Sequence, residues 1–216
     1  MENENKILKF LKPFNRCLAI VSILLSIAAV TVLIMYNFAD VFTIITDDGT
    51  KYAEGFSYPG YQSIFAGVGN MIIQGYTEAT FNIWLFLGCF LPLFGCITCV
   101  VMLSTNFARR GTNKKKAILE GIVGVLCIFG AIMLYNCDKL WIENAKNVTG
   151  SYTYYYEAYL VPAINGELYF GKDTFPSVVF VVCLIAGSVK LLNCGLLLFQ
   201  KYYARSVNKQ QVEVKD

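Results

Sequence analysis

Four long apolar segments restrict this chain to very few folds. They span residues 17–36, 82–104, 117–136 and 176–199. The hydrocarbon core of a bilayer is about 30 Å thick, so roughly 20 apolar residues of helix are needed to cross it. Because lipid offers no hydrogen bonds to the backbone, each segment must satisfy its own N–H and C=O groups as a helix. We therefore predict an all-α membrane protein with a four-transmembrane-helix bundle, in which Pro92 kinks the second helix.

The composition agrees with a chain that lies largely in lipid. Of its 216 residues, 56% are hydrophobic and 15% are charged, whereas soluble domains carry about 25% charged residues. Histidine is absent, which removes the commonest general base and the commonest transition-metal ligand. We predict no cofactor and no metal site. The net charge of +3 is too small to indicate nucleic-acid binding.

Basic residues are distributed unequally among the segments that connect the spans. Thirteen lie in 1–16, 105–116 and 200–216, but only four lie in 37–81 and 137–175. Lysine and arginine accumulate at the cytoplasmic ends of membrane helices. This rule places both termini in the cytoplasm, makes 37–81 and 137–175 extracellular loops, and predicts a multi-pass protein of the plasma membrane.

The cytoplasmic segments raise two further expectations. The first apolar segment should stay in the protein as a signal anchor, and residues 7–12 before it form either an amphipathic surface helix or a basic tail. The middle loop, 105–116, has no acidic residue, and its basic residues either only set topology or also bind anionic lipid. These basic residues are Arg109, Arg110, Lys114, Lys115 and Lys116.

The third and fourth spans each contain one charged residue, Glu120 and Lys190. A lysine near the bilayer midplane costs roughly 2.5–3.5 kcal/mol unless it is paired or hydrated. The axial separation of about 9 Å is within reach of the two side chains, so we predict an intramembrane charge pair whose hydrogen bonding Asn193 completes. The pair is either a structural staple or part of an ion path, a proton path or a lipid-headgroup contact.

Each outer loop contains a turn signal between residues that favour strands. Asp48-Gly49 marks a hairpin in the first loop, and Asn165-Gly166 marks a tight turn in the second. Because an isolated hairpin is marginally stable, we expect the two loops to form one small extracellular sheet.

Tyrosines are concentrated in the same loops. Exposed tyrosines give contact area at low entropic cost and suit protein or glycan binding. Alternatively, the rings form the membrane-interface belt and the core of the sheet. The predicted partner-binding residues are Tyr58, Tyr61, Tyr152, Tyr154, Tyr155, Tyr156 and Tyr159.

The two halves of the chain resemble each other. Tyr36-Asn37 ends the first span and Tyr135-Asn136 ends the third, while Cys89 and Cys99 of the second span correspond to Cys183 and Cys194 of the fourth. This predicts a 2+2 parallel tandem repeat about an axis along the membrane normal.

Seven of the eight cysteines lie within or beside the spans, where thiols behave as small apolar groups. Cys137 alone is predicted to lie at the outer surface, so the extracellular part should have no intramolecular disulfide, and an intermolecular bridge at Cys137 is the alternative. Cys96 and Cys99 form a CxxC sequence, but it lies deep in the second span and no second outer pair accompanies it.

Tetraspanins and claudins share the predicted topology but not the motifs. The chain has no Cys-Cys-Gly sequence, which tetraspanins carry in the second outer loop. Residues 37–81 contain neither the Trp nor the paired cysteines of a claudin first loop. Topology alone is analogy, so we assign no family from the sequence.

Taken as a whole, these features favour a non-enzymatic membrane protein that acts in interaction or assembly through its extracellular loops. Its predicted partners are the lipid bilayer and either another protein or further copies of itself. The alternative is a subunit of an oligomeric channel or transporter, with Lys190 and Glu120 near its pathway. A membrane thiol-redox enzyme is a distant alternative that rests on the CxxC sequence.

Overall fold

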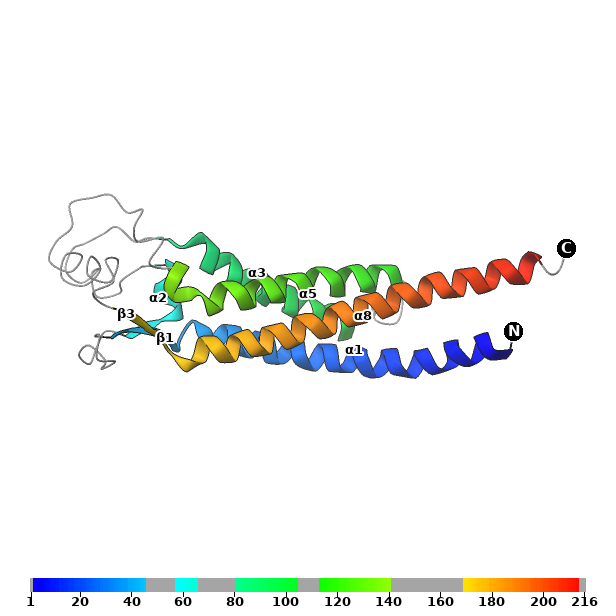
Figure 1. Ribbon diagram of the computed structural model, residues 1–216, viewed down its shortest axis with the longest axis horizontal. Helices are drawn as coiled ribbons and strands as arrows, with labels where there is room; N and C mark the ends of the chain where they lie inside the picture. The colour runs from blue at the N-terminus through cyan, green and yellow to red at the C-terminus, as the bar shows by residue number, and fades with distance from the viewer. Residues whose placement is uncertain (1, 46–56, 66–80, 105–112, 141–168, 214–216) are drawn as a thin grey trace. The chain divides into compact units, whose positions relative to one another are not determined.

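A computed structural model describes residues 2–45, 57–65, 81–104, 113–140 and 169–213 of the chain. Most of these residues are helical, and Figure 1 labels the elements. The long helices are α1 (Glu2–Tyr36), α3 (Ile83–Ser104), α5 (Asn113–Tyr135) and α8 (Thr174–Glu213). Each contains a stretch long and apolar enough to cross a membrane, namely Pro13–Tyr36, Ile83–Ser104, Lys114–Tyr135 and Thr174–Tyr203. The prediction of four apolar helices is therefore confirmed.

The first and last helices are longer than the spans predicted for them. α1 begins at Glu2 and continues through Pro13, so residues 7–12 belong to the same helix as the first span. α8 continues past residue 199 to Glu213. The extension of α8 contains Ala, Arg, Lys and Gln, which have high helix propensity. α3 also continues through Pro92, and the kink predicted there stays a prediction.

Local chemistry explains where two of the helices begin. The Asn82 side-chain oxygen accepts a hydrogen bond from the backbone N–H of Leu85 at 3.1 Å, which caps the first turn of α3. Pro176 lies in the first turn of α8, where its missing N–H would have no partner within the helix.

The chain divides into two compact units, and all four long helices contribute to both. The charge unit consists of Met1–Val30, Pro92–Ile128 and Val182–Asp216. The sheet unit consists of Thr31–Leu91 and Phe129–Val181. The names refer to the buried ion pair of the first unit and the strands of the second.

The sheet unit contains three short antiparallel strands, β1 (Asp40–Ile45), β2 (Ser57–Pro59) and β3 (Tyr169–Lys172), in the order β2-β1-β3. β1 pairs with β2 through a bulge after Asp40, and it pairs with β3 from Phe42 opposite Lys172 to Ile45 opposite Tyr169. Strands from both predicted loop segments therefore lie in one sheet. The Asp48-Gly49 and Asn165-Gly166 turns lie outside the described residues.

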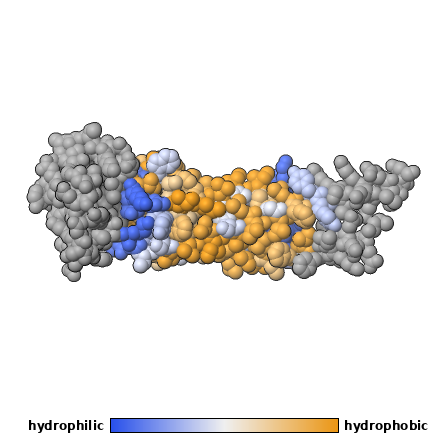
Figure 2. Space-filling model, viewed as in Figure 1, coloured by the Kyte–Doolittle hydropathy of each residue, from blue (hydrophilic) through white to orange (hydrophobic). Residues whose placement is uncertain are grey.

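Among the described side chains, each long helix buries some positions and leaves others half-buried or exposed. In α5 the buried positions include Ala117, Glu120, Val123, Cys127 and Leu134, which recur at the three- and four-residue spacing of one helix face. Most of the large side chains that remain exposed on the four helices are apolar. Apolar residues accordingly cover much of the visible surface of the helices in Figure 2. This surface is compatible with contact with a lipid bilayer.

The tandem repeat stays a prediction. The Asn37 amide donates to the carbonyl of Leu33 at 3.0 Å, and the Asn136 amide donates to that of Ile132 at 2.8 Å. The two proposed equivalents therefore share a local contact. Any asparagine one turn beyond a helical carbonyl can make this contact, so it does not test the duplication.

Candidate functional site

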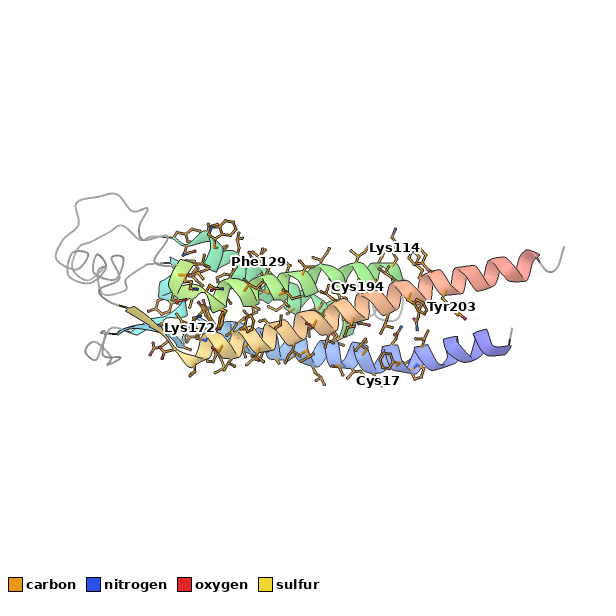
Figure 3. All side chains as sticks on the ribbon, viewed as in Figure 1. Cys17, Lys114, Phe129, Lys172, Cys194 and Tyr203 are labelled. Carbon is orange, nitrogen blue, oxygen red and sulfur yellow. The ribbon has the colours of Figure 1, made fainter. Side chains whose placement is uncertain are left out.

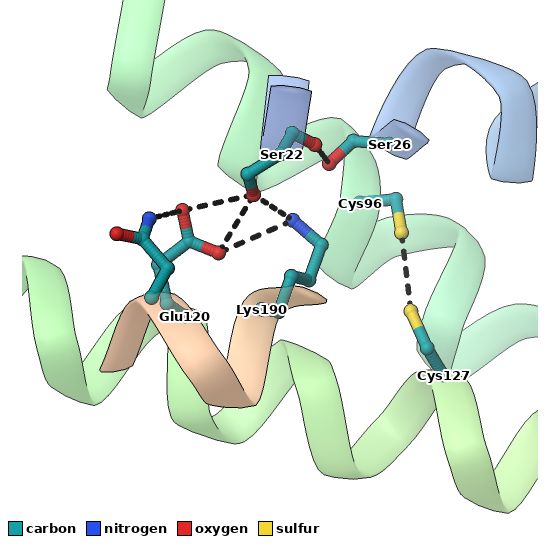
Figure 4. Close-up of polar contacts among 7 residues, drawn as sticks. Ser22, Ser26, Cys96, Glu120, Cys127 and Lys190 are labelled. Atoms are coloured by element: carbon teal, nitrogen blue, oxygen red, sulfur yellow. Dashed lines mark hydrogen bonds and ion pairs between the residues drawn. The ribbon is translucent and has the colours of Figure 1, made fainter. Parts of the chain in front are cut away.

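Four buried polar side chains meet in the charge unit, and three helices provide them. Ser22 comes from α1, Glu120 from α5, and Lys190 and Asn193 from α8. All four are fully buried apart from a 2% exposure of Asn193. Lys190 and Asn193 are three residues apart, so one face of α8 presents both to the carboxylate. Figure 4 shows the arrangement.

Glu120 accepts hydrogen bonds from donors on both neighbouring helices. The Ser22 hydroxyl lies 3.0 Å from Oε1 and 2.9 Å from Oε2, so its single proton is shared between the two oxygens. The Asn193 amide donates to Oε1 at 3.0 Å.

Lys190 reaches the carboxylate both directly and through Ser22. Its ammonium lies 3.4 Å from Glu120 Oε2 and donates to the Ser22 hydroxyl at 3.1 Å. The direct distance is longer than the ~2.7–2.9 Å of a strong charge-assisted hydrogen bond. Ser22 therefore bridges the two charges as well as touching each. The lysine therefore contacts groups on two of the other long helices, α1 and α5.

The charges of this network depend on each other for their hydrogen-bond and ion-pair partners. Removing one partner of a buried ion pair costs about 3–5 kcal/mol, because the other charge then stays buried without a partner. The Ser26 hydroxyl takes no part in the pair, since it donates to the Ser22 carbonyl one turn earlier at 2.7 Å. The network thus contains all three residues of the predicted charge pair together with Ser22, which the sequence reasoning did not select.

The sequence carried a signal for Ser22 that was available but weak. Ser22 and Ser26 are four residues apart, on one face of a span that contains no charge. A serine in a helix usually bonds to its own backbone one turn earlier, as Ser26 does. The sequence does not distinguish a serine whose hydroxyl bonds to its own helix backbone from one whose hydroxyl bonds to a charged side chain on another helix.

The other predicted site residues are only partly covered by the structure. Tyr61 lies in the short helix α2 (Gly60–Phe65) and is 44% exposed. Tyr58 lies in β2, and its side chain is outside the described set, as are Tyr152, Tyr154, Tyr155, Tyr156, Tyr159, Arg109 and Arg110. Lys114 and Lys115 are exposed and Lys116 is half-buried at the beginning of α5, where Figure 3 labels Lys114.

The predicted exposure of Cys137 is wrong. Its side chain is fully buried in the sheet unit. Burial raises the pKa of Cys137 to about 12, and the neighbouring Asp138 carboxylate contributes to the shift. The alternative of an intermolecular disulfide at this residue loses its basis, because the thiol does not reach the surface. All eight cysteines are free thiols.

Several contacts join the two loop-bearing segments at their bases in the sheet unit. The Asn82 amide, just before α3, donates to the carbonyl of Leu140, just after α5, at 2.9 Å. The backbone N–H of Asp173, just after β3, donates to the carbonyl of Val41 in β1 at 3.1 Å. Within the second segment and the end of α5, Lys172 lies 3.8 Å from the Asp138 carboxylate, and its ammonium lies 3.6 Å from the centroid of the Tyr135 ring. Figure 3 labels Lys172. The β1–β3 pairing adds backbone hydrogen bonds to these contacts.

Among the described residues, no group of three or more Cys, Asp and Glu side chains could hold a metal ion. Comparisons with protein-family models, with characterised proteins and with solved structures find no significant match. The contacts within the two units are therefore the basis for any functional proposal.

Proposed function

We propose that this chain is a non-enzymatic membrane protein that acts in interaction or assembly through the two segments 37–81 and 137–175. In this proposal the segments lie outside the cell, and both termini and 105–116 lie in the cytoplasm of a plasma-membrane protein. The unequal distribution of basic residues supports this orientation.

The observation that carries the proposal is the joining of the two segments at their bases. A plain connector between two membrane helices needs only a few residues. Here β1 of the first segment pairs with β3 of the second, the N–H of Asp173 donates to the Val41 carbonyl, and Asn82 donates to the Leu140 carbonyl. Holding the bases of two long segments together reduces the entropy that a partner would have to remove on binding. This supports their acting as one recognition surface.

The buried ion pair favours assembly over transport. A residue that lines an ion path has to be reached by water, whereas Glu120 and Lys190 are both 0% exposed and hydrogen-bonded to each other and to Ser22. This burial supports the staple between helices and counts against the alternative, a channel or transporter subunit. That alternative would need a second arrangement of these helices in which the pair is hydrated.

A photo-crosslinking amino acid placed at Tyr61 tests the proposal in living cells. Tyr61 is the described member of the predicted partner-binding set, and its side chain is 44% exposed. The matched control is the same amino acid at Leu192 of α8, which is 62% exposed on an apolar face. We expect the Tyr61 position to give a discrete protein adduct and the Leu192 position to give lipid adducts.

Coexpression of two differently tagged copies separates the two classes of partner. An adduct that contains both tags identifies a second copy of the chain, and an adduct with one tag identifies another protein. If no protein adduct forms at Tyr61, or if the same adducts form at both positions, these segments do not form the recognition surface.

A further inference from the structure

Two thiols from different helices lie in contact within the charge unit. Cys96 of α3 and Cys127 of α5 have their sulfur atoms 3.4 Å apart, and both side chains are 0% exposed. Figure 4 shows the two side chains pointing toward each other. A disulfide has an S–S distance of ~2.05 Å, so the two sulfur atoms would have to approach by about 1.4 Å to bond. This is a small movement for two side chains that are already in contact.

The contact shows that the thiol partner of Cys96 is not the other cysteine of the CxxC sequence. Cys96 and Cys99 follow each other on α3 at helical spacing, but the sulfur that Cys96 meets is that of Cys127 on the neighbouring helix. Cys127 follows Glu120 by seven residues, about two helical turns, so it lies on the same face of α5 as the ion pair.

We propose that Cys96 and Cys127 form a cross-helix disulfide when the chain meets an organic hydroperoxide dissolved in the lipid phase. The site is thus a reversible modification site that would covalently join α3 to α5 beside the buried ion pair. This inference does not depend on the proposed function or on the orientation of the chain.

The chemistry takes place in two steps. One thiol attacks the distal oxygen of the hydroperoxide; the O–O bond breaks, the thiol proton passes to the departing alkoxide so that an alcohol leaves, and a sulfenic acid remains. The second thiol then attacks the sulfur of the sulfenic acid, the S–S bond forms, and water leaves with the second proton. Two electrons pass from the two sulfur atoms to the peroxide.

Burial in an apolar span selects the oxidant. Glutathione disulfide is charged and stays in water, so it does not enter the hydrocarbon that surrounds a membrane segment. Hydroperoxides of fatty acyl chains and of small apolar molecules dissolve in the hydrocarbon. A neighbouring thiol in contact converts the first oxidation product into a disulfide before it oxidises further.

The test treats the full-length protein in lipid nanodiscs with cumene hydroperoxide, blocks the remaining thiols under denaturing conditions, and maps cross-linked peptides by mass spectrometry. We expect a species that has lost two hydrogen atoms and links Cys96 to Cys127, and that dithiothreitol reverses after unfolding. Cys99→Ala should keep the link, and Cys127→Ala should lose it. If Cys127→Ala fails to fold, the cross-linked peptides of the wild-type protein still show whether Cys96 is linked to Cys127.

Three results would overturn the proposal. They are the absence of any link at Cys96, a link from Cys99 to Cys127 in place of the expected one, and equal cross-linking by glutathione disulfide. The last result would show that the aqueous phase reaches the pair, so the lipid-phase oxidant would no longer be required.

Discussion

The charge unit and the sheet unit both keep polar groups away from water, but by different means. In the charge unit the buried charges are partnered by other side chains, with Ser22 between Glu120 and Lys190. In the sheet unit many of the partners are backbone atoms, such as the Leu140 carbonyl for Asn82 and the strand partners of β1. The first arrangement depends on the identity of each side chain, and the second depends mainly on the path of the chain.

This difference implies different responses to substitution. Removing a charge from the charge unit leaves its partner buried and unpaired, so the loss exceeds the worth of the contact itself. Removing one side chain from the sheet unit leaves the backbone ladder in place, so the loss is limited to that contact. The loss of stability on substitution in each unit therefore tests this difference.

The largest effect is expected for Lys190→Met. It leaves Glu120 buried without its cation and should lower the free energy of unfolding in mixed micelles by about 3–5 kcal/mol. The double variant Lys190→Met/Glu120→Leu removes both charges and should recover most of that loss, since apolar replacements of buried pairs are often neutral. A double variant as unstable as the single one would contradict the staple.

A smaller effect is expected for Asn82 in the sheet unit. Asn82→Ala loses both the cap of α3 and the hydrogen bond to Leu140, and caps alone contribute ~0.5–2 kcal/mol. Asn82→Asp keeps an acceptor for the cap but has no amide to donate to the Leu140 carbonyl. In thermal unfolding we expect stability in the order wild type, Asp, Ala, and an equal loss for both variants would show that the cap contributes nothing.

A still smaller loss of stability is expected for Ser22→Ala in the charge unit. Interhelical hydrogen bonds between side chains in membranes average about 0.6 kcal/mol and reach about 1.7, and Ser22 contacts both charges. The matched control is Ser26→Ala, because its hydroxyl bonds only to the backbone of its own helix among the contacts described here. Equal losses for the two variants, measured by unfolding in the same micelles, would remove Ser22 from the network.

The smallest effect concerns the pH dependence of Cys137. Its pKa is raised from 9.0 to about 12 by burial, so the folded state holds its proton more tightly than the unfolded state. The stabilisation from this group is complete below pH ~9 and is lost as the pH rises through about 12. We expect maleimide to leave Cys137 unmodified at pH 8 in the folded protein and to modify it after unfolding. Modification at pH 8 without unfolding would place the thiol at the surface.

The parts that could be predicted from the sequence follow from strong physical requirements. Apolar segments of sufficient length have few alternatives to a membrane helix, and they appear as four helices. When two such segments contain one acidic and one basic residue, each has few other charged partners within the membrane. Glu120 and Lys190 indeed lie 3.4 Å apart. Asn193, one turn from Lys190, joins them for the same reason.

The parts that could not be predicted depend on packing between distant segments. Cys137 is fully buried in the sheet unit, and no local pattern near Cys137 encodes that burial. The contact between Cys96 and Cys127 likewise depends on the relative rotation of α3 and α5. A sequence shows that both helices carry cysteines, but it does not show which pair of sulfur atoms meets.

The most direct test of the whole account is the orientation of the chain in intact cells. Arg109→Cys and Tyr154→Cys introduce a thiol into 105–116 and into 137–175, respectively, and each is treated with a membrane-impermeant maleimide. We expect Tyr154→Cys to be labelled in intact cells and Arg109→Cys to be labelled only after permeabilisation. Labelling of Arg109→Cys from outside intact cells would contradict the orientation and, with it, the proposed recognition surface.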